Sequence, residues 1–285
     1  MPKSRDTSSI VQRIQLVAAN LTQTEQKLVA ELMRTPREVA LGTSGEFAAR
    51  MGVHEATTSR LARKLGFASY AEFRDTLRNE YLHSADPAGR ISVTLNDARA
   101  KGFLPLLVSG EMAALSALSD HVSDRDILAA AEQLDGQRVF VYGHGNAEVL
   151  SVLMERRLRR LGIDCHMLSG GPRDLAEQML TLSQGDALLV FAFRRPPPAY
   201  RHLMEVASEA GARRVVIAGT IGPALSPAAD VLLSAPRTGM PDGFQTLTVP
   251  MAICNAVILA LAERRGSRAI ATLDQLGALI TRFEI

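Results

Sequence analysis

Two groups of basic side chains could bind an anion. Arg60, Arg63 and Lys64 fall in a stretch that contains no acidic residue, and Arg194-Arg195 stand directly before three consecutive prolines. An arginine guanidinium presents paired N–H donors to a carboxylate or phosphate, whereas lysine contacts a phosphate as a point charge. Because a run of basic residues is more often a solvated surface, the elements that carry these side chains must decide between the two interpretations.

The composition describes a folded chain whose charge is unevenly placed. Of 285 residues, 47% are hydrophobic and 22% are charged, which excludes disordered and fibrous classes and allows one large domain or two ordinary ones. The formal net charge is +2, but residues 1–83 hold 12 Lys and Arg against 9 Asp and Glu, and the remainder holds 20 against 21. The basic excess therefore belongs to the N-terminal part.

Membrane, metal and disulfide classes are not indicated by the sequence. The chain starts without an apolar signal core, and we expect no membrane span, since no stretch approaches about 18 apolar residues. Cys165 and Cys254 are far apart and lack His or Cys neighbours at ligand spacing. We expect a cytoplasmic protein without metal, cofactor, disulfide or catalytic residues.

Residues 9–82 carry the start and stop signals of short helices. The capping-box pattern Ser/Thr-x-x-Glu occurs at 22–25, 35–38, 43–46 and 69–72. Gly42, Gly52 and Gly66 each follow an apolar run, as left-handed residues after a helix do. The expected helices lie near 9–19, 23–34, 36–41, 44–51, 55–65 and 70–82.

The expected helices 44–51 and 55–65 have the dimensions of a helix-turn-helix. We expect Ala56, Leu61 and Leu65 to face the core of this head. The outer face and the N-terminal end of the second helix then offer the side chains that would touch DNA: His54, Thr57, Thr58, Ser59, Arg60, Arg63 and Lys64. Hydroxyls and lysine suit phosphates, and arginine suits a guanine edge or phosphates. A helical module that binds another protein is the alternative.

Residues 21–82 resemble the N-terminal domain of the RpiR-type family of bacterial transcription regulators. The segment GVHEATTSRLARKLGFASYAEFR is the most specific part of the resemblance. It implies that Thr57, Arg60, Arg63 and Lys64 touch double-stranded operator DNA. His54 departs from the family, in which a serine usually caps this helix, and its ring could either cap less well or add a phosphate contact.

The connector at 84–96 combines Pro, Gly and Ser with few apolar positions and predicts a linker. Over 97–121 apolar residues recur with a helical period, and Gly102, Pro105 and Gly110 are expected to break the helix. Such a helix either packs across a dimer or covers the sheet of the second domain.

The remainder of the chain alternates short apolar runs with helical stretches. This alternation predicts a parallel sheet covered by helices on both faces. The expected strands are 138–142, 163–168, 187–193, 214–218 and 231–234. The expected helices are 124–134, 146–161, 173–183, 199–210, a short piece at 223–228, 246–264 and 268–283.

In such a sheet, ligands bind beyond the carboxyl ends of the strands. The loops there carry the candidate effector-binding residues: Gly143, His144, Gly145, Asn146, Arg194, Arg195 and Thr220. The first loop could hold an anion on its amides, but it is not a dinucleotide fingerprint, because Glu148 stands where the third glycine belongs. A tight turn explains the glycines equally well, and a solvated loop or a subunit contact explains the arginines.

Residues 124–262 resemble the sugar isomerase (SIS) domain, which binds phosphosugars and is the usual C-terminal half of RpiR-type regulators. RVFVYGHGNAEVL, QGDALLVF and EAGARRVVIAGT carry much of the resemblance, which implies five parallel strands and dimerisation through this domain. Asn146-Ala147 stand where the family's first loop ends in serine, and 192–197 replaces its Ser-x-Ser-Gly-x-Thr phosphate cradle. The phosphate site is therefore either rebuilt around arginine or lost.

We therefore expect an all-α helix-turn-helix head at 1–83, a linker and connecting helix at 84–122, and an α/β SIS-like domain at 123–285, with a five-stranded parallel sheet covered on both faces. The expected function is a dimeric, sequence-specific DNA-binding transcription regulator that senses a small, anionic, phosphosugar-like metabolite. Two alternatives stay open: a degenerate sensor that only dimerises, and a sugar-phosphate isomerase with His144 or Glu148 as its acid–base group.

Overall fold

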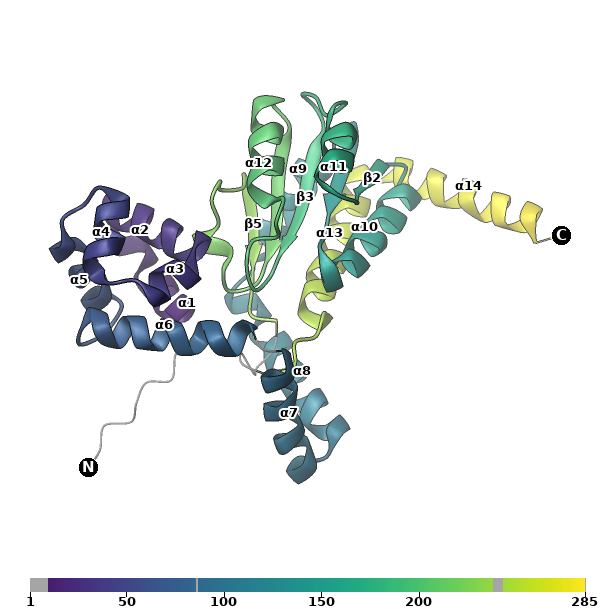
Figure 1. Ribbon diagram of the computed structural model, residues 1–285. Helices are drawn as coiled ribbons and strands as arrows, with labels where there is room; N and C mark the ends of the chain where they lie inside the picture. The colour runs from purple at the N-terminus through teal and green to yellow at the C-terminus, as the bar shows by residue number, and fades with distance from the viewer. Residues whose placement is uncertain (1–9, 86, 238–242, 285) are drawn as a thin grey trace. The chain divides into compact units, whose positions relative to one another are not determined.

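The computed structural model describes residues 10–85, 87–237 and 243–284, and it divides into two compact units (Figure 1). The first unit, the helical head, takes most of the chain up to Val108. The second unit, the body, takes most of the chain from Ser109 onward and holds the sheet. Each unit has its own hydrophobic core and is described by itself.

The head consists of short helices joined by tight turns. They are α1 (Ile10–Val17), α2 (Gln23–Arg34), α3 (Pro36–Leu41), α4 (Ser44–Met51), α5 (Glu55–Lys64) and α6 (Tyr70–Ala85). These bounds follow the predicted helices closely. The apolar residues of the helices meet in one core, whose largest buried members include Leu28, Leu32, Phe47, Leu61, Leu65 and Phe73.

Local capping explains most of the helix ends in the head. The capping boxes at 22–25 and 43–46 are both formed, with hydroxyl and carboxylate each bonded to the other's backbone N–H. The box predicted at 35–38 is wrong, because the Thr35 hydroxyl donates to the Glu31 carbonyl of the preceding helix instead of accepting from the next one. A threonine between two helices can serve only one of them in this way.

The glycine stops are confirmed at two positions of three. Gly52 (φ 64°) and Gly66 (φ 84°) have the left-handed backbone that follows a helix. Gly42 does not, since its φ is −86°. Its lack of a side chain matters for another reason: a Cβ there would lie 2.9 Å from the Glu38 carbonyl oxygen.

The predicted linker at 84–96 is wrong, because this segment is mostly helical. Helix α6 continues to Ala85, and α7 spans Pro87–Lys101, with proline at a first position where its missing N–H costs nothing. Helix α8 (Phe103–Ser116) runs through Pro105 and Gly110, which were expected to break it. Pro105 lies in the first turn, where no intrahelical N–H partner is lost.

Helix α8 also departs from our expectation about membranes. Within the described residues, Phe103–Asp120 is long and apolar enough to cross a membrane by length and composition, and 6% of it is buried. Its exposed side chains include Phe103, Leu104 and Met112, each more than 60% accessible. The apolar period is thus real, but most of these side chains find no partner in the described chain.

The body holds a sheet whose described strands all run parallel. They are β1 (Arg138–Tyr142), β2 (Asp164–Leu168), β3 (Ala187–Ala192), β4 (Arg213–Ala218) and β5 (Val231–Ser234). Their order across the sheet is β2-β1-β3-β4-β5. The central strand β3 pairs with β1 on one side and β4 on the other, and all its residues are buried. This confirms the five-stranded parallel sheet predicted from the apolar runs.

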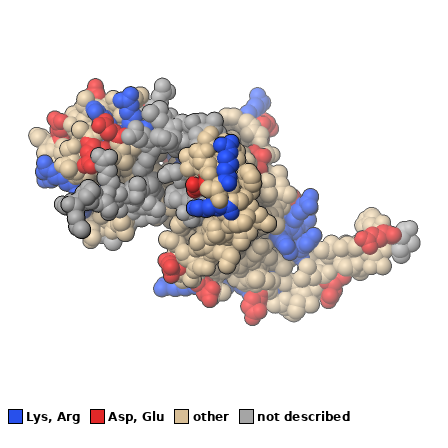
Figure 2. All heavy atoms as spheres, turned by 90° about the horizontal axis from the view of Figure 1, so that it is seen from below, with Lys and Arg blue, Asp and Glu red and all other residues tan. Residues whose placement is uncertain are grey.

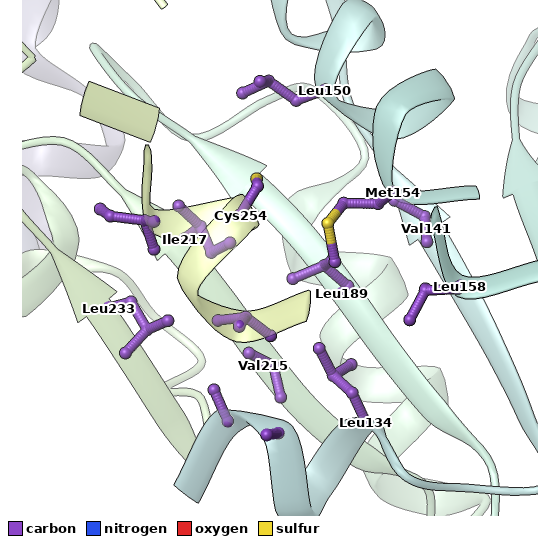
Figure 3. Packing of buried hydrophobic residues seen from close by; sticks show 14 of the residues in the cluster. Leu134, Val141, Leu150, Met154, Leu158, Leu189, Val215, Ile217, Leu233 and Cys254 are labelled. Atoms are coloured by element: carbon purple, nitrogen blue, oxygen red, sulfur yellow. The ribbon is translucent and has the colours of Figure 1, made fainter. Parts of the chain in front are cut away.

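Helices cover both faces of this sheet (Figure 1). They are α9 (Asp124–Leu134), α10 (Glu148–Arg160), α11 (Pro172–Met179), α12 (Tyr200–Glu209), α13 (Thr248–Arg265) and α14 (Ser267–Phe283). Helices α9, α10 and α13 pack on one face, where Leu134, Leu158 and Cys254 meet strand residues such as Leu189 and Val215 (Figure 3). Helix α12 packs on β3 and β4 from the other face. The expected short helix near 223–228 is reduced to a 3₁₀ turn at Gly222–Ala224.

Candidate functional sites

Helices α4 and α5 form a compact helix-turn-helix in the head. The turn begins at Gly52, and the Val53 N–H donates to the Ala48 carbonyl at 3.0 Å, which closes the end of α4. The inner side of α5 buries Leu61, Ala62 and Leu65 in the core of the head. Burial of this side fixes which residues of α5 remain outside.

His54 caps the N-terminus of α5. Its Nδ1 accepts from the backbone N–H of Ala56 at 3.2 Å. The neighbouring Glu55 carboxylate accepts from the Ser44 hydroxyl at the start of α4. The acid at the N-terminus of α5 is therefore engaged with α4.

The outer side of α5 carries Ala56, Arg60 and Arg63, which are exposed, and Ser59, which is half-buried, at the i, i+3, i+4, i+7 spacing of one helical face. Arg60 and Arg63 are exposed, and the Arg60 guanidinium donates to the Thr57 hydroxyl at 3.3 Å. Ala56 was expected in the core but is exposed. A small residue there lets the backbone of α5 come close to a partner.

Thr58 and Lys64 do not belong to this exposed face. Thr58 is 1% accessible, and its hydroxyl donates to the Glu55 carbonyl at 2.8 Å, so placing it among the DNA contacts was wrong. The Lys64 ammonium donates to the Asn20 carbonyl at 2.6 Å and to Glu25 at 2.7 Å. Burial raises the pKa of Glu25, but bonds from Lys64 and from Thr22 outweigh it and hold that pKa below its ordinary value. Lys64 thus ties α5 to α2.

Charge on the head is otherwise mixed. Figure 2 shows basic and acidic side chains interspersed over the face of the head that it presents. Arg50, for example, pairs with Glu38. A uniform basic field does not single out a binding surface there, so the exposed face of α5 is defined by its own residues.

In the body, the strand order places two of the predicted loops together. The chain leaves β1 for β2 on one side and returns to β3 on the other, so the carboxyl ends of β1 and β3 lie side by side at the point where the strand order reverses. The loop after β1 holds Gly143 to Asn146, and the loop after β3 holds Arg194 and Arg195. Sequence reasoning chose these loops one by one, and the strand order makes them neighbours.

The loop after β1 is tight, and one of its backbone N–H groups is already bonded to a side chain of the same chain. A Cβ on Gly143 would lie 2.5 Å from the Ala147 carbonyl oxygen and 2.6 Å from the Ser151 hydroxyl. The Gly145 N–H donates to the Glu148 carboxylate at 3.3 Å. One of the amides proposed to hold an anion therefore faces a carboxylate of the chain itself. His144 and Asn146 are exposed at the rim.

The loop after β3 is anchored at its far end. The Tyr200 N–H donates to the Pro197 carbonyl at 2.9 Å, and the Tyr200 hydroxyl donates to the Pro227 carbonyl at 2.8 Å. Burial raises the pKa of Tyr142, whose hydroxyl oxygen also accepts a bond from the Ala199 backbone. These bonds hold the prolines in place and leave Arg194 and Arg195 exposed.

A third arginine joins this edge from the loop after β5. The Arg237 guanidinium lies 4.9 Å from the centre of the Phe193 ring. Thr220, after β4, is half-buried, and a Cβ on the preceding Gly219 would lie 2.7 Å from the Phe193 carbonyl oxygen. Nothing in the sequence near Arg237 singled it out, because its partner lies 44 positions earlier in the chain.

The cysteines carry no evident chemistry. Cys165 and Cys254 are both free and buried. Burial raises the pKa of each thiol to about 12. Within the described residues no group of three or more His, Cys, Asp or Glu side chains is arranged to hold a metal ion.

The first six helices of the head match the model of a known family. Residues 8–84 match the model of the helix-turn-helix domain of the rpiR family, which covers α1 to α6. The head is an rpiR-family helix-turn-helix domain. The α4–α5 pair described above is the helix-turn-helix of this rpiR-family domain.

Curated relatives of different total length match most of this chain. A HTH-type transcriptional regulator of Haemophilus influenzae is 22% identical over 242 residues, which cover 83% of each chain. The bifunctional protein glk of Paraburkholderia xenovorans is 24% identical over 218 residues, 76% of this chain and 34% of that protein. This chain thus spans about a third of the length of several curated relatives that it matches.

Solved structures show the fold of the body. The sugar isomerase domain of the RpiR transcription factor from Sphaerobacter thermophilus is 21% identical and covers 60% of this chain and 96% of that one, with a TM-score of 0.55. NanR of Vibrio vulnificus, solved with ManNAc-6P, is 16% identical and covers 96% and 99%, with a TM-score of 0.53. The body therefore has the fold of these SIS domains.

Proposed function

We propose that the protein is a cytoplasmic transcription regulator that binds operator DNA through α5 and responds to a small anionic metabolite in its SIS domain. The observation that carries the first part is the exposed face of α5. Ser59, Arg60 and Arg63 lie along it, and the small side chain of Ala56 lies at its N-terminal end. In helix-turn-helix proteins this second helix enters the major groove with its N-terminal residues on base edges.

The contacts divide by chemistry. Arg60, which lies one turn into the helix and is oriented by Thr57, is placed for a guanine edge or a phosphate. Arg63, nearer the C-terminal end, suits a phosphate. His54 and Ser59 stand where they can donate to phosphates. Thr58 and Lys64 are left out of this interface because both are bonded within the head.

DNase footprinting and gel-shift titration of the full chain on DNA flanking its gene test this proposal. Arg60→Ala should weaken specific binding by about 1–3 kcal/mol and relax sequence preference at one position. Arg201→Ala, on an exposed part of the body, is the matched control and should bind as the wild type does. Wild-type protein without sequence preference, together with unchanged binding by Arg60→Ala, would reject the assignment.

For the effector, we place an anion at the carboxyl ends of β1 and β3, where the strand order reverses. Arg194 and Arg195 lie on one side, and Arg237 approaches from the loop after β5. Guanidinium groups can replace lost serine hydroxyls, since each donates paired N–H groups to phosphate or carboxylate. NanR binds a phosphosugar on the same fold, which supports the phosphosugar class without naming the ligand.

The bond between Gly145 and Glu148 in the loop after β1 indicates how the effector is oriented. Because Glu148 accepts from Gly145, an incoming phosphate would meet a carboxylate on that side. The anionic group of the effector is therefore assigned to the arginine side. The hydroxyl-bearing end of the molecule then faces His144 and Asn146.

A thermal-shift and calorimetry panel of phosphosugars and small carboxylates tests the sensor. An anion in the panel should raise the melting temperature of the wild type, and Arg195→Ala should abolish that shift while leaving the ligand-free melting temperature unchanged. Arg173→Ala, an exposed arginine of α11, is the control. If no anion stabilises the wild type, the degenerate-sensor alternative replaces the effector proposal while DNA binding stands.

We also propose that the protein is a homodimer and that α8 contributes to the pairing. Phe103, Leu104 and Met112 are each more than 60% exposed, and a second copy could cover them. Two α5 helices would then read half-sites one helical turn, or a multiple of it, apart. In light scattering, the wild type should have at least the mass of a dimer, and Leu104→Ser with Met112→Ser should have a lower mass than the wild type. Sedimentation of the wild type with lipid vesicles would instead assign the apolar helix to a membrane.

Isomerase activity is the weaker candidate. Aldose–ketose isomerisation needs a base positioned beside the bound phosphate. Glu148 is bonded to the loop that carries it, and His144 is exposed at the rim. We expect no interconversion of phosphosugars by the full chain, and a coupled assay that detects turnover abolished by Glu148→Gln would reverse this assignment.

A further inference from the structure

Helix α14 is an amphipathic helix with little to pack on. Of its 17 residues, Ala269 alone is buried. Its apolar side chains follow the helical period, and five of them are exposed: Ile270 (61%), Leu273 (43%), Leu279 (41%), Ile280 (45%) and Phe283 (87%). Figure 1 shows the helix continuing away from the sheet, and at 1.5 Å per residue it is about 25 Å long. Its second half therefore presents an uncovered apolar stripe.

A groove runs between α14 and α10. It encloses about 430 Å³, and its apolar side consists of Leu276, Leu279 and Ile280. Arginines of α10 form the opposite rim, and Figure 2 shows basic side chains gathered where α14 leaves the body. Arg156 and Arg160 form no ion pair with any residue that the structure describes. The groove is therefore complementary to an apolar side chain that has an acidic side chain next to it.

The end of α14 has that chemistry. Phe283 is the most exposed of the large apolar side chains in the described chain, and Glu284 follows it directly. We propose that the groove is occupied by the end of α14 from a second copy. Phe283 of each copy packs on Leu279 and Ile280 of the other, and Glu284 meets the arginine rim.

The proposed contact has two-fold symmetry. The same patch serves both copies, as a two-fold interface requires, so the contact makes pairs and not filaments. Gly277 lies in the middle of α14, where glycine costs about 1 kcal/mol relative to alanine, and a Cβ there would find nothing within 4 Å. The missing side chain leaves room for the backbone of the neighbouring helix.

The contact between two α14 helices is too small to hold two copies together by itself. A stable interface buries about 800 Å² on each partner, and one face of a helix about 25 Å long is smaller than that. The α14 exchange therefore joins copies that are also joined elsewhere. We place it between two of the homodimers proposed above, so this inference rests on that dimer and the larger assembly holds twice as many subunits.

Sedimentation velocity of the full chain over a range of concentrations tests the proposal. Phe283→Ser should halve the mass of the largest species that the wild type forms and leave the melting temperature unchanged, since the ring is 87% exposed. Leu180→Ser removes an equally exposed leucine (81%) elsewhere on the body and should leave the mass as in the wild type. Equal masses for wild type and Phe283→Ser at every concentration would overturn the proposal.

Charge reversal gives a second measurement that a folding defect cannot imitate. Glu284→Arg alone, and Arg156→Glu with Arg160→Glu, should each lower the population of the larger species at least threefold. The triple variant should recover it, because the reversed charges again face each other. If the triple variant does not recover the larger species, the proposed pairing of Glu284 with Arg156 and Arg160 is rejected. A wild type that shows the smaller species alone would assign the stripe to a different protein partner.

Discussion

The guanidinium of Arg237 lies 4.9 Å from the centre of the Phe193 ring, so the loop after β5 meets the end of β3 across the carboxyl edge of the sheet. The Phe193 ring also stacks on Phe191, with 6.2 Å between ring centres. The aromatic pair holds a positive charge beside the loop of Arg194 and Arg195. Three arginines from two loops thus lie at the edge of the sheet where the effector is proposed to bind.

The first prediction concerns this third arginine. Arg237→Leu keeps an apolar contact with the Phe193 ring but removes the charge. Because a hydrogen bond to a charged group contributes about 1.5–3 kcal/mol, the variant should bind a stabilising phosphosugar or carboxylate at least tenfold more weakly by calorimetry. Unchanged affinity would mean that Arg237 supports the loop and does not contact the ligand.

The second prediction separates two basic residues of α5. Lys64→Ala removes the bonds to Asn20 and Glu25, so it should destabilise the head by about 1 kcal/mol in urea unfolding. Arg60→Ala should leave the stability unchanged and weaken DNA binding. The salt dependence of binding should fall by about 1 unit of slope only for a residue that contacts a phosphate. If Lys64→Ala reduces that slope and leaves stability intact, Lys64 returns to the DNA interface.

The third prediction concerns the ion pair between Arg138 and Asp186 at the amino ends of β1 and β3. Asp186 is fully buried, and Arg138 donates to both its carboxylate oxygens, Nη2 at 2.7 Å and Nε at 3.1 Å. Burial raises the pKa of Asp186, but the bonds from Arg138 and Ser183 outweigh it, so that pKa lies below its ordinary value of 3.8. Breaking such a pair leaves a charge without its partner, and Asp186→Asn should cost about 3 kcal/mol at neutral pH.

The pH dependence follows from the direction of the shift. A lowered pKa in the folded state stabilises the protein above the unfolded-state pKa, and this stabilisation is lost as the pH falls through the folded-state value. The wild type should therefore lose stability below about pH 4, and Asp186→Asn should lose less over the same range. Urea unfolding at several pH values measures this difference. Parallel curves for the two proteins would contradict the assignment.

The fourth prediction uses the tight first loop. Gly143→Ala forces a Cβ against the Ala147 carbonyl oxygen at 2.5 Å and the Ser151 hydroxyl at 2.6 Å, so the loop must shift. We expect a loss of about 1–3 kcal/mol in stability. Adding Ser151→Ala should recover part of it, because one of the two clashing atoms is then removed. Full stability of Gly143→Ala would show that the loop adapts without strain.

Local patterns predicted the elements well. The capping boxes at 22–25 and 43–46 join residues three positions apart, so the sequence contains the whole interaction. The apolar runs of β1 and β5 gave strand bounds that the structure repeats. The prediction failed where a residue had a second option: Thr35 bonded to the helix before it, and Pro87 began a helix where a linker was expected.

The two candidate sites depended more on packing. Ala56 and Thr58 exchange their expected places because the rotation of α5 about its axis is set by its contact with α4. Lys64 was assigned to DNA because its charge is visible in the sequence, whereas its bond to Glu25 joins positions 39 apart. Charge can thus be read along the chain, but its partners cannot.

The amino-acid sequence was sufficient to place the helices of the head, the parallel strands of the body and the two basic clusters, because each depends on contacts within a few residues or on a short apolar period. Folding in three dimensions settled which loops meet. The strand order brings the loops after β1 and β3 together and carries Arg237 to Phe193. Pairing between distant strands leaves no local signature, since the same apolar run can occupy any central position in a parallel sheet.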